Sequence, residues 1–157
     1  RRARGVGADI IVRAPGTSVI SLSSASMPEK LVAFFAQQPH VRLATGTVVY
    51  PIGGINTVTG IELGEFDKIS GGFKYLAGGP FRNPGDIIVD GFYDGQNKLG
   101  VGSTVTLLNR GWRVCGIVEP GKLARLVIPR ATLQDLAGAT GKLRSWLVGG
   151  VALCLVV

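Results

Sequence analysis

Glycine occupies 24 of the 157 positions in this chain, about twice its usual share, and it follows no short period. The missing Gly-X-Y period excludes a collagen-like chain. Glycine scattered among short apolar runs is typical of turns that join short strands. Hydrophobic residues make up 46% of the chain and charged residues 17%, which excludes an intrinsically disordered chain. The length is that of one domain, so we expect residues 1–157 to form a single domain.

One helix has clear end signals in the first third of the chain. Ser26 and Glu29 match the Ser-x-x-Glu capping box, which predicts a helix start. Pro39 predicts its end. The apolar residues between these signals recur at helical spacing and predict one buried face; they are Leu31, Phe34 and Phe35.

Apolar runs bounded by turn residues predict short strands along the rest of the chain. These runs cover 8–13, 41–52, 55–61, 86–90, 103–108, 112–118, 123–128 and 145 onward. Gly53-Gly54 predicts one hairpin, and Asn109-Arg110-Gly111 predicts another with a three-residue loop whose last residue is left-handed. Short helices are expected over 90–99 and 129–137, whereas 62–83 is turn-rich and its secondary structure is left open. Strands mostly neighbour strands in this order, which predicts an α+β fold rather than a doubly wound sheet.

The chemistry-bearing residues form no recognisable catalytic or metal-binding motif. The chain has one histidine, His40, which argues against a zinc site and is expected in an exposed turn. Two carboxylate pairs, Glu62 with Glu65 and Asp86 with Asp90, keep a hydrolase open as an alternative. Asp86 and Asp90 flank a strand, where capping or solvated carboxylates usually stand. We therefore expect no enzyme activity, no cofactor and no metal.

Two cysteines, Cys115 and Cys154, lie outside any metal-ligand spacing. Both lie in apolar runs, which favours two buried thiols; a disulfide between them in an oxidising compartment is the alternative. The tail from residue 146 to 157 is apolar, and the sequence leaves open whether it is a strand or the start of a membrane helix. No run of 18 or more apolar residues occurs in the chain.

The net charge of +7 favours anionic partners, and a stand-alone basic nucleic-acid-binding domain is the alternative function. The basic residues are mostly spread singly, so we expect no nucleic-acid partner. The aromatic residues gather in the middle of the chain, and core packing is the favoured explanation for them. They are Phe66, Phe73, Tyr75, Phe81, Phe92 and Tyr93. The candidate partner surface is Phe73, Lys74 and Tyr75, because they lie in the turn-rich segment.

Seven short motifs follow one another along the chain. They are Gly7-Ala8-Asp9-Ile10-Ile11-Val12, Thr59-Gly60-Ile61-Glu62 with Phe66, Leu76-Ala77-Gly78-Gly79-Pro80-Phe81, Asp86-Ile87-Ile88-Val89-Asp90, Leu99-Gly100-Val101-Gly102-Ser103-Thr104-Val105, Trp112-Arg113-Val114-Cys115-Gly116-Ile117-Val118 and Val127-Ile128-Pro129-Arg130-Ala131-Thr132-Leu133-Gln134. In this order and spacing the chain resembles the extracytoplasmic core domain of MacB/FtsX-type ABC transporter permeases, from Gly7 to about Gly141.

The resemblance implies a domain inserted between two membrane helices of a permease, facing the periplasm or the cell exterior. It implies a porter-like α+β part, residues 1–61 plus 123–157, and a small strand-rich part, residues 62–122. Such permeases dimerise and work with a separate cytoplasmic ATPase. The outer domain would bind a substrate or partner, such as an adaptor, a lipoprotein or a peptide, and would transmit ATP-driven movement. The chain has no phosphate-binding loop of the type G-x-x-x-x-G-K-[ST]. The resemblance implies that this motif belongs to the ATPase subunit.

Overall fold

The computed structural model describes residues 9–12, 28, 30–53, 56–136 and 151–156. Its strands are β1 (Ile10–Val12), β2 (Leu43–Gly53), β3 (Asn56–Ile61), β4 (Tyr75–Gly78), β5 (Asp86–Asp90), β6 (Thr104–Leu107), β7 (Arg110–Val118), β8 (Leu126–Pro129) and β9 (Val151–Val156). Its helices are α1 (Lys30–Ala36), α2 (Leu63–Ser70), α3 (Gly91–Asn97) and α4 (Arg130–Leu136). Helices set around a mixed sheet confirm the predicted α+β fold.

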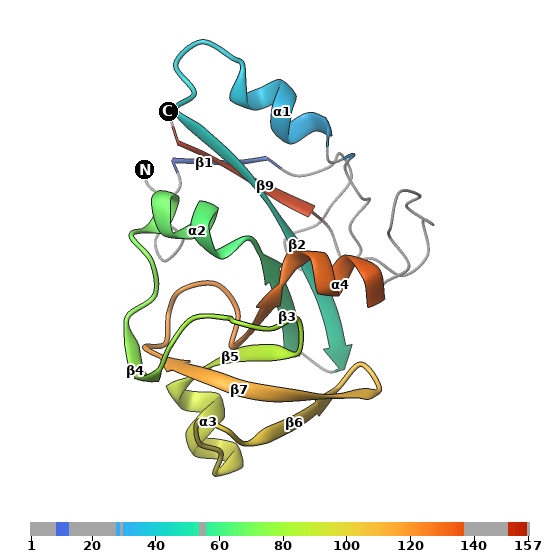
Figure 1. The fold of residues 1–157 in the computed structure, drawn as a ribbon. Coiled ribbons are helices and arrows are strands. Elements are labelled where there is room, and N and C mark those ends of the chain that lie inside the picture. Colours follow the sequence, from blue (N-terminus) through green and yellow to red (C-terminus); the bar gives the residue numbers. More distant parts are fainter. Residues whose placement is uncertain (1–8, 13–27, 29, 54–55, 137–150, 157) are drawn as a thin grey trace.

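The strands form one hydrogen-bonded sheet in the order β1-β9-β2-β3-β8-β5-β7-β4, and β6 also pairs with β7. The β3–β8 and β5–β7 pairs are parallel, and the other pairs are antiparallel. The first strand pairs with the last, with Ile10 opposite Leu155. Figure 1 shows β1 and β9 at one end of the molecule and β6 and β7 at the other. The start of β1 and the end of β9 therefore lie side by side near one edge of the sheet.

The core lies on both faces of the middle strands. All five residues of β5 are buried, including the two aspartates that flank its apolar residues Ile87, Ile88 and Val89. Successive side chains of a strand point to opposite faces, so Ile87 and Ile88 belong to different clusters. Ile87 packs in a cluster that includes Trp112 and Leu133, while Ile88 packs in a cluster with Phe66 and other apolar residues. The middle of the sheet is thus covered on both sides.

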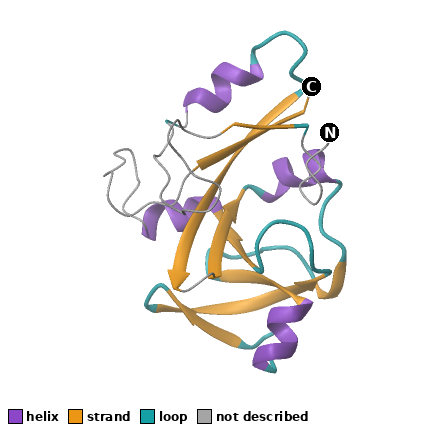
Figure 2. Cartoon of the chain, turned by 180° about the vertical axis from the view of Figure 1, so that it is seen from behind, coloured by secondary structure: helices purple, strands orange, loops and turns teal. Residues whose placement is uncertain are grey.

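The helices cover different parts of this sheet (Figure 2). Helix α4 contacts β2, β3 and β8, α1 contacts β2, and α3 contacts β5 and β7. The backbone of α4 approaches β3 closely at Gly60, where an added Cβ would lie 3.1 Å from the Arg130 Cα. It would also lie 3.1 Å from Leu133 Cδ2, and Leu133 is fully buried. Glycine in the Thr59-Gly60-Ile61 motif therefore allows α4 to approach β3 closely, and a Cβ at this position would need its neighbours to shift by a few tenths of an ångström.

The second hairpin forms with a different turn from the one predicted. Strands β6 and β7 are joined by two residues, Leu108 (φ 53°) and Asn109 (φ 58°), both in the left-handed region. This is the signature of a type I′ turn. Gly111 lies within β7, so the predicted three-residue loop is wrong. The observed register places Val105 opposite Trp112, and both side chains are buried.

Two elements lie in the stretch for which no regular structure was predicted. Helix α2 presents Phe66 and Ile69 to the core and ends at Gly71 in the left-handed conformation, with φ of 74°. Strand β4 follows it and pairs with β7. Two smaller predictions are also wrong: Phe34 is 55% exposed rather than buried, and β8 begins at Leu126 rather than at residue 123.

Some predictions fall outside the described residues. These are the Ser26–Glu29 capping box, the Gly54 position of the first hairpin, the end of the last helix at residue 137, and the strand start at residue 145. The described part of that tail is strand β9. The division into two subdomains stays a prediction; strands β5 and β8, which lie on either side of it, share two register positions, Ile88–Val127 and Val89–Leu126.

Candidate contact surfaces

The predicted surface at Phe73, Lys74 and Tyr75 is mostly packed against the core. The Phe73 ring lies 4.7 Å from the Phe66 ring and 6.4 Å from the Tyr75 ring, measured between centroids. Burial, followed by the charge of Asp67, raises the pKa of Tyr75 to about 12. Lys74 is exposed, and its Nζ lies 2.5 Å from Oε1 of Glu119. Of the three residues, Lys74 is exposed, whereas Phe73 and Tyr75 are half-buried. The partner surface at these residues stays a prediction.

Exposed apolar side chains lie nearby on the edge strand β4 and around α3. Leu76 is 57% exposed, Phe92 61% and Val101 49%. An added Cβ at Gly91 would lie 3.3 Å from Leu76, and one at Gly78 would lie 2.9 Å from Val101. These contacts place Leu76 beside the start of α3, and Val101 beside the end of β4. The sequence gives no signal for Leu76 or Val101, because apolar residues in a strand and a glycine turn are usually buried.

Asp86 and Asp90 stand at the two ends of β5 and have separate structural tasks. Their positions, four residues apart along a strand, are separated by about 13 Å. Asp86 Oδ2 accepts hydrogen bonds from the backbone N–H groups of Arg82 (2.8 Å) and Asn83 (3.0 Å). Asp90 Oδ1 accepts one from the Tyr93 N–H at 2.7 Å and caps α3. The structure does not bring this pair together for acid–base chemistry, and the capping interpretation is confirmed.

The two carboxylates of the other pair, Glu62 and Glu65, have different surroundings. Glu65 Oε2 accepts a hydrogen bond from the Thr45 hydroxyl and lies 3.4 Å from Arg130 Nη1. Arg130 Nη1 also donates to the Gly46 carbonyl oxygen at 2.8 Å. Glu62 is exposed and makes no side-chain cap at the start of α2. Glu65 therefore links α2 to β2 and α4 through these contacts, and Glu62 does not contribute to them.

The remaining candidate residues are placed as follows. His40 lies exposed in a turn with φ of 68°, as predicted. Cys115 is a free, buried thiol that donates to the Ile87 carbonyl oxygen at 3.4 Å. The side chain of Cys154 lies outside the described residues. Among the described residues, no group of three or more His, Cys, Asp or Glu side chains could hold a metal ion.

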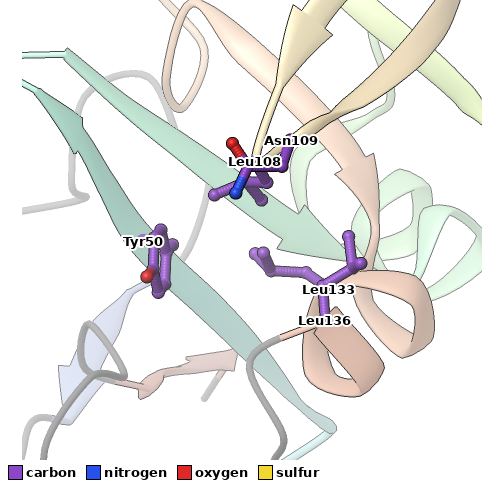
Figure 3. A pocket seen from close by; sticks show the side chains of 5 residues that line it. All are labelled: Tyr50, Leu108, Asn109, Leu133 and Leu136. Carbon is purple, nitrogen blue, oxygen red and sulfur yellow. The ribbon is translucent and has the colours of Figure 1, made fainter.

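A small cavity of about 190 Å³ lies between β2, the β6–β7 turn and α4 (Figure 3). Five side chains line it: Tyr50, Leu108, Asn109, Leu133 and Leu136. Its volume is below the roughly 300–1,000 Å³ of typical small-molecule sites. Charged and nucleophilic groups are missing from its lining. The cavity carries no argument for a reaction.

Two solved structures are similar to this chain over most of its length. The periplasmic region of MacB from Actinobacillus actinomycetemcomitans matches with a TM-score of 0.62 and 15% sequence identity, covering 98% of this chain and 76% of that one. The extracellular domain of the noncanonic ABC-type transporter YknZ from Gram-positive bacteria matches with a TM-score of 0.60 and 13% identity, covering 92% and 80%. No protein-family model matches the chain, and no curated protein does.

At these identities the similarity establishes the fold. Among the helices of the described residues, none has the length and apolar character needed to cross a membrane. The ordered motifs in the sequence and the match over nearly the whole chain point to the same architecture. The chain therefore has the fold of the periplasmic or extracellular domains of ABC transporter permeases such as MacB.

Proposed function

We propose that this chain is the extracytoplasmic domain of an ABC transporter permease subunit. In this role it binds a substrate or partner protein outside the cell membrane and couples that contact to the motion driven by a separate ATPase. The observation that carries the proposal is the fold match to the periplasmic region of MacB over 98% of the chain. It works by contact and movement, and it is not an enzyme.

The pairing of the first and last strands supports this role. A domain inserted between two membrane helices must receive and return the chain at one place. Strands β1 and β9 are antiparallel neighbours, with Ile10 opposite Leu155 and Val12 opposite Leu153. The start of β1 and the end of β9 therefore lie side by side. Movement of two helices joined at these points would reach the sheet through adjacent strands.

The continuity of the sheet supports the coupling role. Strands β9 and β2 pair over six register positions, from Leu43–Val156 to Val48–Val151. Strand β2 then pairs with β3, and β3 with β8, without a break in hydrogen bonding. A displacement at the chain ends would be carried as a rigid-body movement to β5 and β7.

A labelling experiment on the complete gene product tests the location. Thr106 is exposed on β6, and a Thr106→Cys variant places one accessible thiol there, while Cys115 stays buried. Cys154 is replaced by serine in the same chain. We expect a membrane-impermeant maleimide to label this cysteine in cells whose outer envelope has been opened but whose cell membrane is intact.

The control is the same sample after lysis of the cell membrane, which gives the maximum labelling. Equal labelling before and after lysis supports the proposal. Labelling that requires lysis would place the domain in the cytoplasm and overturn it. The parent chain with Cys154 replaced by serine reports the background from Cys115.

A further inference from the structure

A basic corner lies at the start of β5, formed by Arg82, Arg110 and Arg113 around the turn that contains Gly85 and Asp86. The Arg113 N–H donates to the Gly85 carbonyl oxygen at 2.9 Å. An added Cβ at Gly85 would lie 3.6 Å from Arg110 Nη2. The Arg82 N–H donates to Asp86, as described above. The side chains of Arg110 and Arg113 and the backbone of Arg82 thus lie around one turn, and they come from two separate segments.

The charge at this corner is not neutralised by the residues that surround it. Asp86 is the one carboxylate in these contacts, and its side chain is 2% exposed. Three positive groups against one negative group leave an excess of two positive charges. Arg113 reaches Asp86 through Nε at 3.4 Å and keeps 57% of its side chain exposed. Among the described residues, the Arg82 side chain makes no hydrogen bond or ion pair, and Arg82 is exposed.

Arg110 is held in place before any partner arrives. Its guanidinium carbon lies 4.7 Å from the centre of the Trp112 ring. Trp112 is fully buried, and its indole N–H donates to the Leu107 carbonyl oxygen at 3.0 Å. A guanidinium stacked on an aromatic face keeps its N–H donors in the plane, free to bind a carboxylate. A side chain ordered in advance loses less entropy on binding.

We propose that the basic corner of Arg82, Arg110 and Arg113 docks an acidic, carboxylate-bearing segment of a partner protein. Arginine binds carboxylates through two parallel hydrogen bonds, which gives both affinity and orientation. The position of the corner in the sheet favours a protein over a membrane surface. Strand β7 lies six positions away from β1 in the sheet. At roughly 4.8 Å between neighbouring strands, the two strands are about 29 Å apart. The choice of a protein rather than a membrane as the partner rests on the proposed function, in which the membrane adjoins the ends of β1 and β9.

Fluorescence anisotropy with a labelled octaglutamate peptide tests the docking at low salt. The triple variant Arg82→Gln, Arg110→Gln, Arg113→Gln is compared with a matched triple, Lys30→Gln, Arg42→Gln, Lys68→Gln, which removes three exposed cations elsewhere. We expect the corner variant to bind the peptide at least about tenfold more weakly than the parent. The matched variant should stay within about twofold of the parent.

Because Arg113 also pairs with Asp86, the double variant Arg82→Gln, Arg110→Gln is measured as well. It keeps the Asp86 pair, and its melting temperature shows whether it is folded. A folded double variant that binds several-fold more weakly than the parent supports the docking site. Parent-like binding by the folded double variant would overturn it.

Three further outcomes would overturn the inference. Equal losses in the two triple variants, or no binding of the peptide by the parent, would show that the corner is not a site. If the triple corner variant bound the peptide as the parent does but lost binding to vesicles of phosphatidylglycerol and phosphatidylcholine, the corner would be a membrane contact. None of these three results bears on the maleimide labelling, so failure of this inference is distinct from failure of the proposed function.

Discussion

Ile10 lies opposite Leu155 in the antiparallel pairing of β1 with β9, although the two residues stand at opposite ends of the sequence. Strand β9 then pairs with β2, with Ala44 opposite Leu155, so it lies between the first two strands of the chain. The return of the chain to its starting point is what an inserted domain requires. The pairing of β1 with β9 can be tested directly by a disulfide cross-link.

An Ile10→Cys, Leu155→Cys double variant, made with Cys154→Ser, should form a disulfide under mild oxidation. Partners in an antiparallel pair have Cα atoms about 4.5–5.5 Å apart, within the range that a disulfide spans. The readout is the mass of the intact chain with and without reductant. The control pair is Ile10→Cys with Ala152→Cys, three residues away along β9, about 10 Å out of register. Equal cross-linking of the two pairs would contradict the register.

Gly78→Ala should destabilise the chain strongly. Gly78 has φ of 69°, and an added Cβ would lie 2.1 Å from the Cys115 carbonyl oxygen. Left-handed strain and steric overlap together predict a loss of about 2–5 kcal/mol in the free energy of unfolding. The adjacent Gly79→Ala is the matched control, because an added Cβ there meets no atom within 4 Å. Urea denaturation that gives the same midpoint for both variants would contradict this packing.

Asp86→Asn should lower stability at neutral pH by about 1–3 kcal/mol. Burial opposes ionisation of Asp86, but the Arg82 and Asn83 N–H groups and the Arg113 guanidinium outweigh it and lower its pKa below 3.8. The stabilisation is therefore complete above the unfolded-chain pKa and is lost as the pH falls through the lower native pKa. Urea denaturation of the parent and of Asp86→Asn between pH 7 and pH 3 measures this loss of stabilisation.

The difference in stability between the parent and Asp86→Asn should shrink on acidification. Asp135→Asn, which replaces an exposed carboxylate on α4, should change stability at neutral pH by less than about 0.5 kcal/mol. A difference between the parent and Asp86→Asn that grows as the pH falls would reverse the sign and contradict the assigned interactions.

Cys115 should be unreactive in the folded chain. Burial, followed by the charge of Asp86, raises its thiol pKa to about 11. The thiolate is the reactive form, so at pH 8 little of it is present and reagents cannot reach it. In a Cys154→Ser chain we expect no reaction with Ellman's reagent until guanidinium unfolds the protein. The Thr106→Cys variant should release one equivalent when folded; rapid reaction of Cys115 itself would contradict its burial.

The sequence predicts the fold where local and long-range signals agree. Strand β5 was recognised from its three apolar residues, Ile87, Ile88 and Val89, and the structure has a strand over the predicted residues 86–90. The turn between β6 and β7 was predicted wrongly, because Asn109-Arg110-Gly111 has the composition of a three-residue loop. The register that buries Val105 against Trp112 instead places Leu108 in a left-handed conformation. Tertiary packing of the strands outweighed the local preference of the turn residues.

The contact surfaces were harder to predict than the fold. Phe73 precedes β4 and Tyr75 begins it, and composition does not show that α2 places Phe66 in the cluster against which both residues pack. The basic corner was missed because Arg82 and Arg110 are far apart in the sequence and look like isolated cations. Only the parallel pairing of β5 with β7, which sets Asp86 opposite Arg113, brings them to one turn. Such long-range pairing is not visible in local patterns.

The central claim is that this chain belongs to a permease subunit that works with a separate ATPase. The most direct measurement is isolation of the tagged, complete gene product from its own membranes in mild detergent, followed by mass spectrometry. We expect the protein in the membrane fraction, together with a stoichiometric subunit that carries a phosphate-binding Walker A motif. Recovery of the protein from the soluble fraction, or from membranes without any such ATPase, would contradict the claim.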